Sequence, residues 1–335
     1  MRNDTRRLFN AYLQQLAQLH GVDDVTTKFA AAPAVAQTLE TRIQESSEFL
    51  GRINMYGVTE QMGEKIGLGV TGPLAGTTDT AAQDRETRDI SSLDDRGYVC
   101  TQTNFDTHLT YAKLDAWAKF PDFQARIRDA IIKLMALNRI MIGWNGTSRA
   151  ATSNPATNPL LQDVNIGWLQ KMRTENAARV MSEVVDASGQ ITIGAGSDFE
   201  NLDALVFSMV SEFIQPWYQE DPELVVVCGR QLLADKYFPI INKPNAPSEM
   251  LAADIVTSQK RIGNLPAVRV PYFPANGLLV TRLDNLSLYW QEGTRRRTVV
   301  DNAKRDRIEN YESVNEAYVI EDLGCAAMAE NIVLS

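Results

Sequence analysis

Apolar side chains recur at helical spacing near the start of the chain. Six of them fall on one stripe of a predicted helix, namely Leu8, Phe9, Tyr12, Leu13, Leu16 and Leu19. Asp4 or Thr5 is placed to cap this helix, and Gly21 is placed to end it. The next stretch, VDDVTTKFAAAP, has no apolar period and is rich in small and polar residues, which predicts an exposed linker that proteases can cut.

A second helix is predicted over residues 33–50, after which the period becomes that of a strand. In EKIGLGV, apolar residues alternate with Gly67 and Gly69, so one face of this strand carries no side chains. The returning limb, residues 98–114, alternates again, with a bulge predicted near Asn104 and Phe105. The two limbs predict a long two-stranded excursion, which must lie on another surface because it has little core of its own.

The strongest helical pattern lies in DFQARIRDAIIKLMALNRIMIGWNG, from near Asp122 to Gly146. At about 1.5 Å per residue, roughly 23 residues span ~35 Å, which is long for a helix. The apolar stripe of this spine helix is predicted to consist of Phe123, Ile127, Ile131, Leu134, Ile140 and Trp144. A loop and a shorter helix follow. From about residue 199, helices and apolar strands predict a compact α/β unit, and the last forty residues read as strands that pair with earlier ones.

The stretch GLGVTG matches the dinucleotide-binding pattern G-x-G-x-x-G through Gly67, Gly69 and Gly72. That pattern binds a pyrophosphate only where a helix begins after it. Pro73 and a threonine-rich segment occupy that place, so the glycines favour a bent strand or a close backbone approach instead. A nucleotide-binding enzyme that uses the loop from Gly67 to Gly72 remains the alternative function.

Composition narrows the class of protein. The 335 residues, 44% hydrophobic and 22% charged, are typical of a globular chain of about two domains. The formal net charge of −9 argues against a broad basic surface for nucleic acid. Three distant cysteines indicate no disulfide framework and fit a reducing compartment. The N-terminus lacks the apolar region of a signal peptide, and Lys133 and Arg139 interrupt the most apolar helical run, so no membrane segment is expected.

Candidate chemistry is sparse. The histidines, His20 and His108, have no partner at metal-ligand spacing, so neither a metal site nor a cofactor is expected. No G-x-S-x-G motif or other catalytic set is present. A self-assembling structural protein is therefore favoured over an enzyme, because several predicted elements cannot bury their own apolar faces.

The concentrated basic cluster is Arg295, Arg296 and Arg297. In a strand, the first and third of these side chains would point to one face and the second to the other. Salt bridges within or between subunits are favoured for them over contacts with nucleic-acid phosphates. A nucleic-acid-binding module that uses these arginines is the third function considered.

Long stretches of the sequence resemble the major capsid proteins of P2-like tailed bacteriophages, and the resemblance runs nearly end to end. The most specific stretches are NPLLQDVNIGWLQKMR, PWYQEDPELVVVCGRQLLADKYFPIINK, SEMLAADIVTSQKRIGNLPAVRVPYFPA and RIENYESVNEAYVIED. The resemblance implies the α+β, HK97-like capsid fold. Its implied parts are a removable N-terminal segment (1–29), an N-arm (30–55), an extended hairpin or E-loop (56–112), a P-domain with the spine helix (113–194 and 281–335) and an axial A-domain (195–280).

The resemblance also implies a function. Such subunits form hexamers and pentamers of an icosahedral shell around double-stranded DNA, together with a scaffold and protease protein and a portal protein. Contact with the packaged DNA would be weak and non-specific, and the shell would assemble in the host bacterial cytoplasm without a membrane partner. Maturation cleavage is expected between Phe29 and Ala30, in TTKFAAAP.

The same resemblance gives the glycines of GLGVTG a structural role. In an E-loop, a strand face without side chains can lie close against the backbone of a neighbouring subunit. The candidates for contacts between subunits are therefore Gly67, Gly69, Gly72, Arg295, Arg296 and Arg297.

Overall fold

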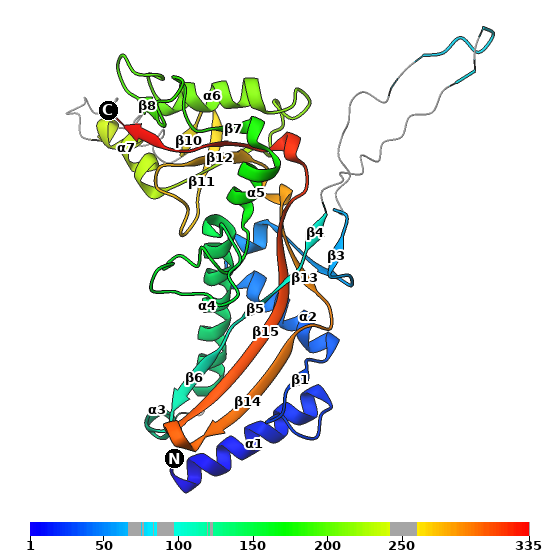
Figure 1. Cartoon of the computed structure of the whole chain (residues 1–335), viewed down its shortest axis with the longest axis vertical. Helices are drawn as coiled ribbons and strands as arrows, with labels where there is room; N and C mark the ends of the chain where they lie inside the picture. The colour runs from blue at the N-terminus through cyan, green and yellow to red at the C-terminus, as the bar shows by residue number, and fades with distance from the viewer. Residues whose placement is uncertain are drawn as a thin grey trace. The chain divides into compact units, whose positions relative to one another are not determined.

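The computed structural model of the chain (Figure 1) describes residues 1–65, 75, 77–82, 84–85, 97–118, 120, 123–241 and 260–334. The chain divides into two compact units, each assembled from segments that are distant in sequence. Unit 1 comprises residues 1–63, 99–167 and 288–318, and unit 2 comprises residues 64–98, 168–287 and 319–335. Both units combine helices with sheets, which confirms the predicted α+β class.

The sheet of unit 1 is organised around one long strand, β15 (Arg307–Ile320). The main path of this sheet runs in the order β1-β14-β15-β13-β2. Its other strands are β1 (Phe29–Ala30), β2 (Asn54–Val58), β13 (Leu286–Gln291) and β14 (Arg296–Asn302). Two short strands, β5 (Thr101–Asn104) and β6 (Thr107–Thr110), pair with β15 as well. The C-terminal strands therefore pair with earlier segments, as the sequence predicts.

The returning limb differs from its prediction in two respects. Asn104 pairs with Ser313 and Thr107 with Asn310, so β5 and β6 keep one register along β15 and no residue is inserted. The predicted bulge is therefore wrong, and the amide of Phe105 still donates to the carbonyl of Glu312 at 2.7 Å. The limb also ends earlier, because residue 111 begins a helix. Two further strands, β3 (Met62–Gly63) and β4 (Tyr98–Val99), form a separate two-stranded sheet.

The helices of unit 1 are α1 (Asn3–His20), α2 (Pro33–Glu45), α3 (Tyr111–Trp117) and α4 (Phe123–Asn145), with a 3-10 turn η1 (Leu50–Arg52). Gly21 ends α1 with a left-handed φ of 64°, as predicted. The predicted cap at Asp4 or Thr5 is wrong: Arg2 precedes the helix, and Asp4 lies in the first turn, where its charge favours the helix dipole. The second helix is shorter than predicted.

The spine helix α4 has the predicted length but buries a different face. Ile140 and Trp144 are buried as expected, whereas Leu134 is 52% exposed and Ile127 and Ile131 are only partly buried. The buried face is formed by Ile132, Met135, Ala136, Arg139, Ile140, Ile142 and Trp144. Apolar spacing fits two adjacent faces of this helix, and the ion pairs that bury Arg139 select between them.

The loop after α4, residues 147–165, has no helix or strand, as predicted. Its ends meet where the amide of Gly167 donates to the carbonyl of Gly146 at 3.0 Å. A Cβ atom at Gly146 would lie 2.1 Å from the carbonyl oxygen of Asn165. Only glycine therefore fits this approach.

Unit 2 contains a six-stranded sheet in the order β10-β11-β9-β12-β16-β7. Its strands are β7 (Val180–Met181), β9 (Val225–Cys228), β10 (Arg261–Ile262), β11 (Leu265–Arg269), β12 (Leu278–Thr281) and β16 (Ala327–Ala329). The fully buried β9 is parallel to β11 and antiparallel to β12. A second, parallel sheet pairs β8 (Ile191–Ile193) with β17 (Ile332–Leu334).

The helices of unit 2 are α5 (Trp168–Glu175), α6 (Leu202–Phe213) and α7 (Arg230–Ile241). Four 3-10 turns complete the described elements: η2 (Ala177–Arg179) and η3 (Leu283–Asn285), then η4 (Ala303–Arg305) of unit 1 and η5 (Leu323–Cys325) of unit 2. Leu205, Val206 and Met209 of α6 pack into the core against the sheet. Within the part of the chain that the structure describes, no helix combines the length and apolarity needed to cross a bilayer.

Candidate cleavage joint and interaction surfaces

The predicted cleavage joint is a strand rather than an exposed linker. Phe29 pairs with Arg297 and Ala30 with Arg296, so β1 extends the edge of the unit 1 sheet. Phe29 is only 8% exposed and Val25 is 2% exposed, whereas Ala30 is exposed. The prediction of an exposed linker is therefore wrong at these buried residues. Phe29 and Ala30 are held by pairing with β14. The sequence period of this stretch does not predict that pairing.

His20 contacts residues on both sides of the predicted cleavage bond, Phe29 and Ala32. Its Nδ1 atom accepts a hydrogen bond from the amide of Ala32 at 3.3 Å, and its ring lies 5.0 Å from that of Phe29 between centroids. Burial, followed by the charge of Arg297, lowers the pKa of His20. The neutral imidazole is thus favoured, which is the form that can accept this hydrogen bond.

The three consecutive arginines have separate environments. Arg295 is 2% exposed and forms ion pairs with Glu40 and Glu312, whereas Arg296 is exposed. Arg297 donates to the Oδ1 atom of Asn310 at 2.8 Å. The favoured salt-bridge interpretation is confirmed for Arg295, inside its own unit. Contacts with other subunits stay a prediction for this cluster.

Arg295 belongs to a buried ionic cluster that joins α2, α4 and β15. Arg139 donates from Nη1 to Glu40 Oε2 at 2.6 Å and from Nη2 to Glu316 Oε1 at 2.5 Å. All five members are nearly inaccessible to solvent, namely Glu40, Arg139, Arg295, Glu312 and Glu316. The sequence contains no signal for this cluster, because its members lie between positions 40 and 316.

The cluster contains three carboxyl groups and two guanidinium groups. The arginine charges therefore cannot pair one to one with the carboxyl groups. Burial opposes ionisation of Glu40, but the charges of Arg139 and Arg295 outweigh it and hold the pKa of Glu40 below its usual range. Burial raises the pKa of Glu316 despite the attraction of Arg139, and the charge of Glu40 raises it further. Glu316 Oε2 is buried without a hydrogen-bond partner. The pKa values of Glu40 and Glu316 are therefore shifted in opposite directions, although both carboxyl groups accept from Arg139.

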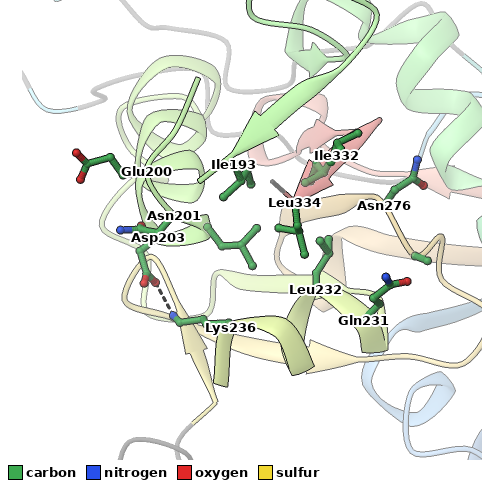
Figure 2. Close-up of a pocket in the computed structure, with 13 residues that line it drawn as sticks. Ile193, Glu200, Asn201, Asp203, Gln231, Leu232, Lys236, Asn276, Ile332 and Leu334 are labelled. Carbon is green, nitrogen blue, oxygen red and sulfur yellow. Dashed lines mark hydrogen bonds and ion pairs between the residues drawn. The ribbon is translucent and has the colours of Figure 1, made fainter. Parts of the chain in front are cut away.

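Unit 2 has a separate open hollow, drawn in Figure 2, with a volume of about 970 Å³. Its apolar lining comes from Ile193, Leu202, Leu232 and Ile332. The carboxylate of Asp203 is occupied by Lys236 Nζ at 2.6 Å and by the amide of Gly263 at 2.6 Å. The hollow therefore offers apolar contact surface and no free acid–base pair among its labelled residues.

The remaining candidates carry no reactive group. Burial raises the pKa of Cys100 and Cys325 to about 12 and that of Cys228 to about 11, so these thiols are not activated. His108 is exposed in β6 opposite Glu309. Gly67, Gly69 and Gly72 lie outside the described residues. Among the residues that are described, no group of three His, Cys, Asp or Glu side chains could hold a metal ion.

Comparisons with known proteins agree on one family. A family model described as "Phage major capsid protein, P2 family" matches residues 8–332. A relative from Escherichia phage P2, described as "Capsid proteins", is 55% identical over 340 residues, which cover 99% of this chain and 95% of that protein. The major capsid protein of Serratia phage KSP20 is 41% identical, with 100% of this chain and 98% of that protein covered.

Solved structures agree with the family match. A chain of the satellite phage P4 procapsid, solved with its size determination (Sid) protein, has a TM-score of 0.84 and 52% identity over 100% of this chain and 99% of that chain. A capsid of a GTA particle, at 12% identity, 86% and 90% coverage and a TM-score of 0.52, shares the fold alone. This chain therefore belongs to the P2 family of phage major capsid proteins, with their HK97-like fold, and is a structural protein of the virion capsid rather than the nucleotide-binding enzyme that GLGVTG offered as an alternative.

Proposed function

We propose that this capsid protein assembles as hexamers and pentamers into an icosahedral shell around a double-stranded DNA genome, guided by a scaffold protein. The observation that carries the proposal is the match over the whole of this chain to a subunit of a procapsid, an assembly that precedes the finished shell. Many weak, repeated interfaces would stabilise such a shell through multivalency.

The proposal includes maturation by cleavage between Phe29 and Ala30. Residues 1–29 would bind the scaffold and protease protein during assembly and would then be removed. The amide of Ala31 donates to the carbonyl of Arg295 at 2.9 Å, directly beyond the bond to be cut. A protease needs an extended, accessible segment, so β1 must leave β14 before cleavage.

The division into capsid parts belongs to the same proposal. Residues 30–55 would form the N-arm and 56–112 the E-loop. Residues 113–194 and 281–335, which include α4 and β15, would form the P-domain, and 195–280, which include α6, α7 and β9 to β12, would form the A-domain. Gly67, Gly69 and Gly72 of the E-loop would contact a neighbouring subunit.

Other partners follow from the chemistry of a filled shell. A portal protein would occupy one vertex, and contact with packaged DNA would be weak and non-specific because the formal net charge of the chain is −9. Assembly would take place in the host bacterial cytoplasm. The size determination (Sid) protein belongs to the P4 procapsid structure, and the proposal assigns no such protein to this chain.

Co-expression of this chain with its scaffold and protease partner tests the proposal. Negative-stain electron microscopy should show closed shells, and mass spectrometry of their subunits should show a chain that begins at Ala30. Deletion of residues 1–29 before assembly should give aberrant shells or none. Soluble subunits alone from the full chain, or normal shells from the truncated chain, would contradict the proposed assembly route.

A further inference from the structure

The N-terminal segment, residues 1–29, covers an apolar area of unit 1. Val299 of β14 is 3% exposed and Ile308 of β15 is 7% exposed, and both pack with Leu16, Val25 and Phe29 of the segment. Tyr111 and Leu114 of α3 join the same cluster. Figure 1 shows α1 beside the paired ends of β14 and β15. Removal of the segment would expose these apolar side chains to water, which is unfavourable in proportion to their area.

The segment also covers a strand edge. β14 pairs with β15 along its whole length, and its other edge faces the segment. There the amide of Val299 donates to the carbonyl of Val25 at 3.0 Å. Without residues 1–29, the amide of Val299 would lose this partner, whereas Ala30 would stay opposite Arg296. Hydrogen exchange in β14 therefore reports whether the segment is in place.

The covered surface selects a basic partner. Asp301 forms an ion pair with Arg6, and Asp115 accepts from the amide of Arg2 at 2.9 Å and lies 3.9 Å from the N-terminal amine. Two acidic side chains thus flank the apolar cluster. A helix with an apolar stripe and basic neighbours matches both features, and α1 itself has that composition.

The same chain carries a second helix of this kind. On α4, Ile127, Ile131 and Leu134 stand at positions i, i+4 and i+7, and they form the stripe that unit 1 leaves partly or largely exposed. Lys133 is exposed beside this stripe. Two different surfaces of one chain that fit each other generate a heterologous contact, and repetition of such a contact closes into rings when the rotation between copies allows it.

We propose that residues 1–29 mask a docking surface for a second copy of this chain. The surface consists of Tyr111, Leu114, Val299 and Ile308, flanked by Asp115 and Asp301. The α4 stripe of the second copy, Ile127, Ile131 and Leu134, occupies it once the segment has left. This inference rests on the proposed function, because shell assembly supplies both the neighbouring copy and the removal of the segment.

The test displaces residues 1–29 from the docking surface in the full-length chain. The double variant Leu16→Asp/Val25→Asp places two charges in the covered cluster, and its matched control, Leu8→Asp/Leu19→Asp, changes two leucines of α1 that are 51% and 59% exposed. Hydrogen exchange across β14 should become at least tenfold faster in the double variant only. Sedimentation velocity should then show concentration-dependent self-association of the double variant at micromolar concentration, while the control and the parent chain remain unassociated.

Two further measurements separate docking from aggregation of a damaged fold. A synthetic peptide of residues 1–29 should reverse the association and restore slow exchange, whereas the same peptide with Leu16→Asp should not. Adding Leu134→Asp to the opened chain should abolish association, whereas Asp129→Lys, a charge change at an exposed position of α4 on the side opposite the stripe, should not.

Several results would overturn the proposal: unchanged exchange in β14, exchange without association, or association that the peptide does not reverse. Shells from the parent chain with its partners, seen by electron microscopy, would in each of these cases leave the proposed function standing.

Discussion

At the scale of single residues, the most consequential side chain is Arg139, a charge in the middle of the spine helix. It is fully buried, and its guanidinium is shared between Glu40 and Glu316 while its Cζ atom lies 5.9 Å from the centroid of the Phe105 ring. Burying a charge is costly unless it is paired, and removing one partner of a buried pair leaves the others uncompensated. The cluster therefore ties three elements together only as long as it is complete.

Arg139→Ala should destabilise the subunit by about 3–5 kcal/mol, because two buried carboxyl groups lose their partner. Urea denaturation followed by circular dichroism measures this loss. The matched control is Arg128→Ala on the same helix, whose exposed side chain pairs with the adjacent Asp129 at 3.2 Å. It should change stability by less than ~0.5 kcal/mol. Equal effects of the two substitutions would show that the buried cluster does not stabilise the fold.

The two carboxyl groups that share Arg139 should respond to pH in opposite directions. The pKa of Glu40 is lowered in the folded chain, so its contribution to stability is present above the ordinary pKa and is lost as the pH falls. The pKa of Glu316 is raised, so the folded chain holds a proton that the unfolded chain releases, and stability falls as the pH rises above the ordinary value of 4.5.

Denaturation of Glu40→Gln and Glu316→Gln between acid and neutral pH tests this assignment. Relative to the parent chain, Glu40→Gln should become less stable as the pH rises, because it lacks the favourable ionised group. Glu316→Gln should become relatively more stable over the same change, because it lacks the proton that the folded state must retain. Parallel pH profiles for the two variants would contradict opposite shifts of the two pKa values.

At the scale of elements, the pattern of the sequence predicts what local periodicity controls. The limits of α1 at Gly21 and of α4 at Asn145, and the buried strand β9, follow from apolar spacing and helix stops. Periodicity does not say which of two adjacent apolar faces is buried, so the predicted stripe of α4 is wrong at Leu134, whose side chain is exposed. Nor does it show that β1 pairs with β14, since that contact joins residues far apart in the sequence.

For the candidate site, too, the local sequence pattern predicts some features and not others. The alternating pattern of a strand predicts that Arg296 faces away from its two neighbours, and Arg296 is the exposed one of the three, although β14 begins only at Arg296. The partners of Arg295 come from α2 and β15, so the local sequence does not reveal them. Recognition of long sequence stretches supplies the family and the HK97-like fold. The cleavage bond, the limits of the capsid parts and the role of Gly67, Gly69 and Gly72 stay predictions.

Glycine substitutions test the close approach that ends α4. Gly146→Ala should destabilise the subunit by about 1–3 kcal/mol, because its Cβ would overlap the carbonyl of Asn165 at 2.1 Å and the loop would have to move. Gly51→Ala is the control, since the nearest atom to its added Cβ, the carbonyl oxygen of Gln44, is 4.0 Å away. Thermal unfolding should separate the two variants, and an unchanged midpoint for Gly146→Ala would mean that the loop adapts without cost.

At the scale of the whole molecule, a side chain can contact a neighbouring subunit only if contacts within its own subunit leave it exposed. Arg295 is committed to Glu40 and Glu312, whereas Arg296 is exposed on β14 opposite Ala30. An exposed charge contributes little to the stability of its own subunit, but repulsion across an interface that is repeated throughout a shell is multiplied by the number of copies. Substitution of Arg296 should therefore separate folding from assembly.

Arg296→Glu should leave the free energy of unfolding within ~0.5 kcal/mol of the parent chain, because surface substitutions rarely change it more. The yield of closed shells from co-expression with the scaffold partner, counted by electron microscopy, should fall at least tenfold if this side chain meets an acidic group of a neighbouring subunit. Arg305→Glu is the control, because Arg305 is also exposed but lies outside β14, in η4. Shells at the parent yield from Arg296→Glu, or an equal loss from both variants, would remove Arg296 from the contacts between subunits and leave Arg297 as the candidate of this cluster.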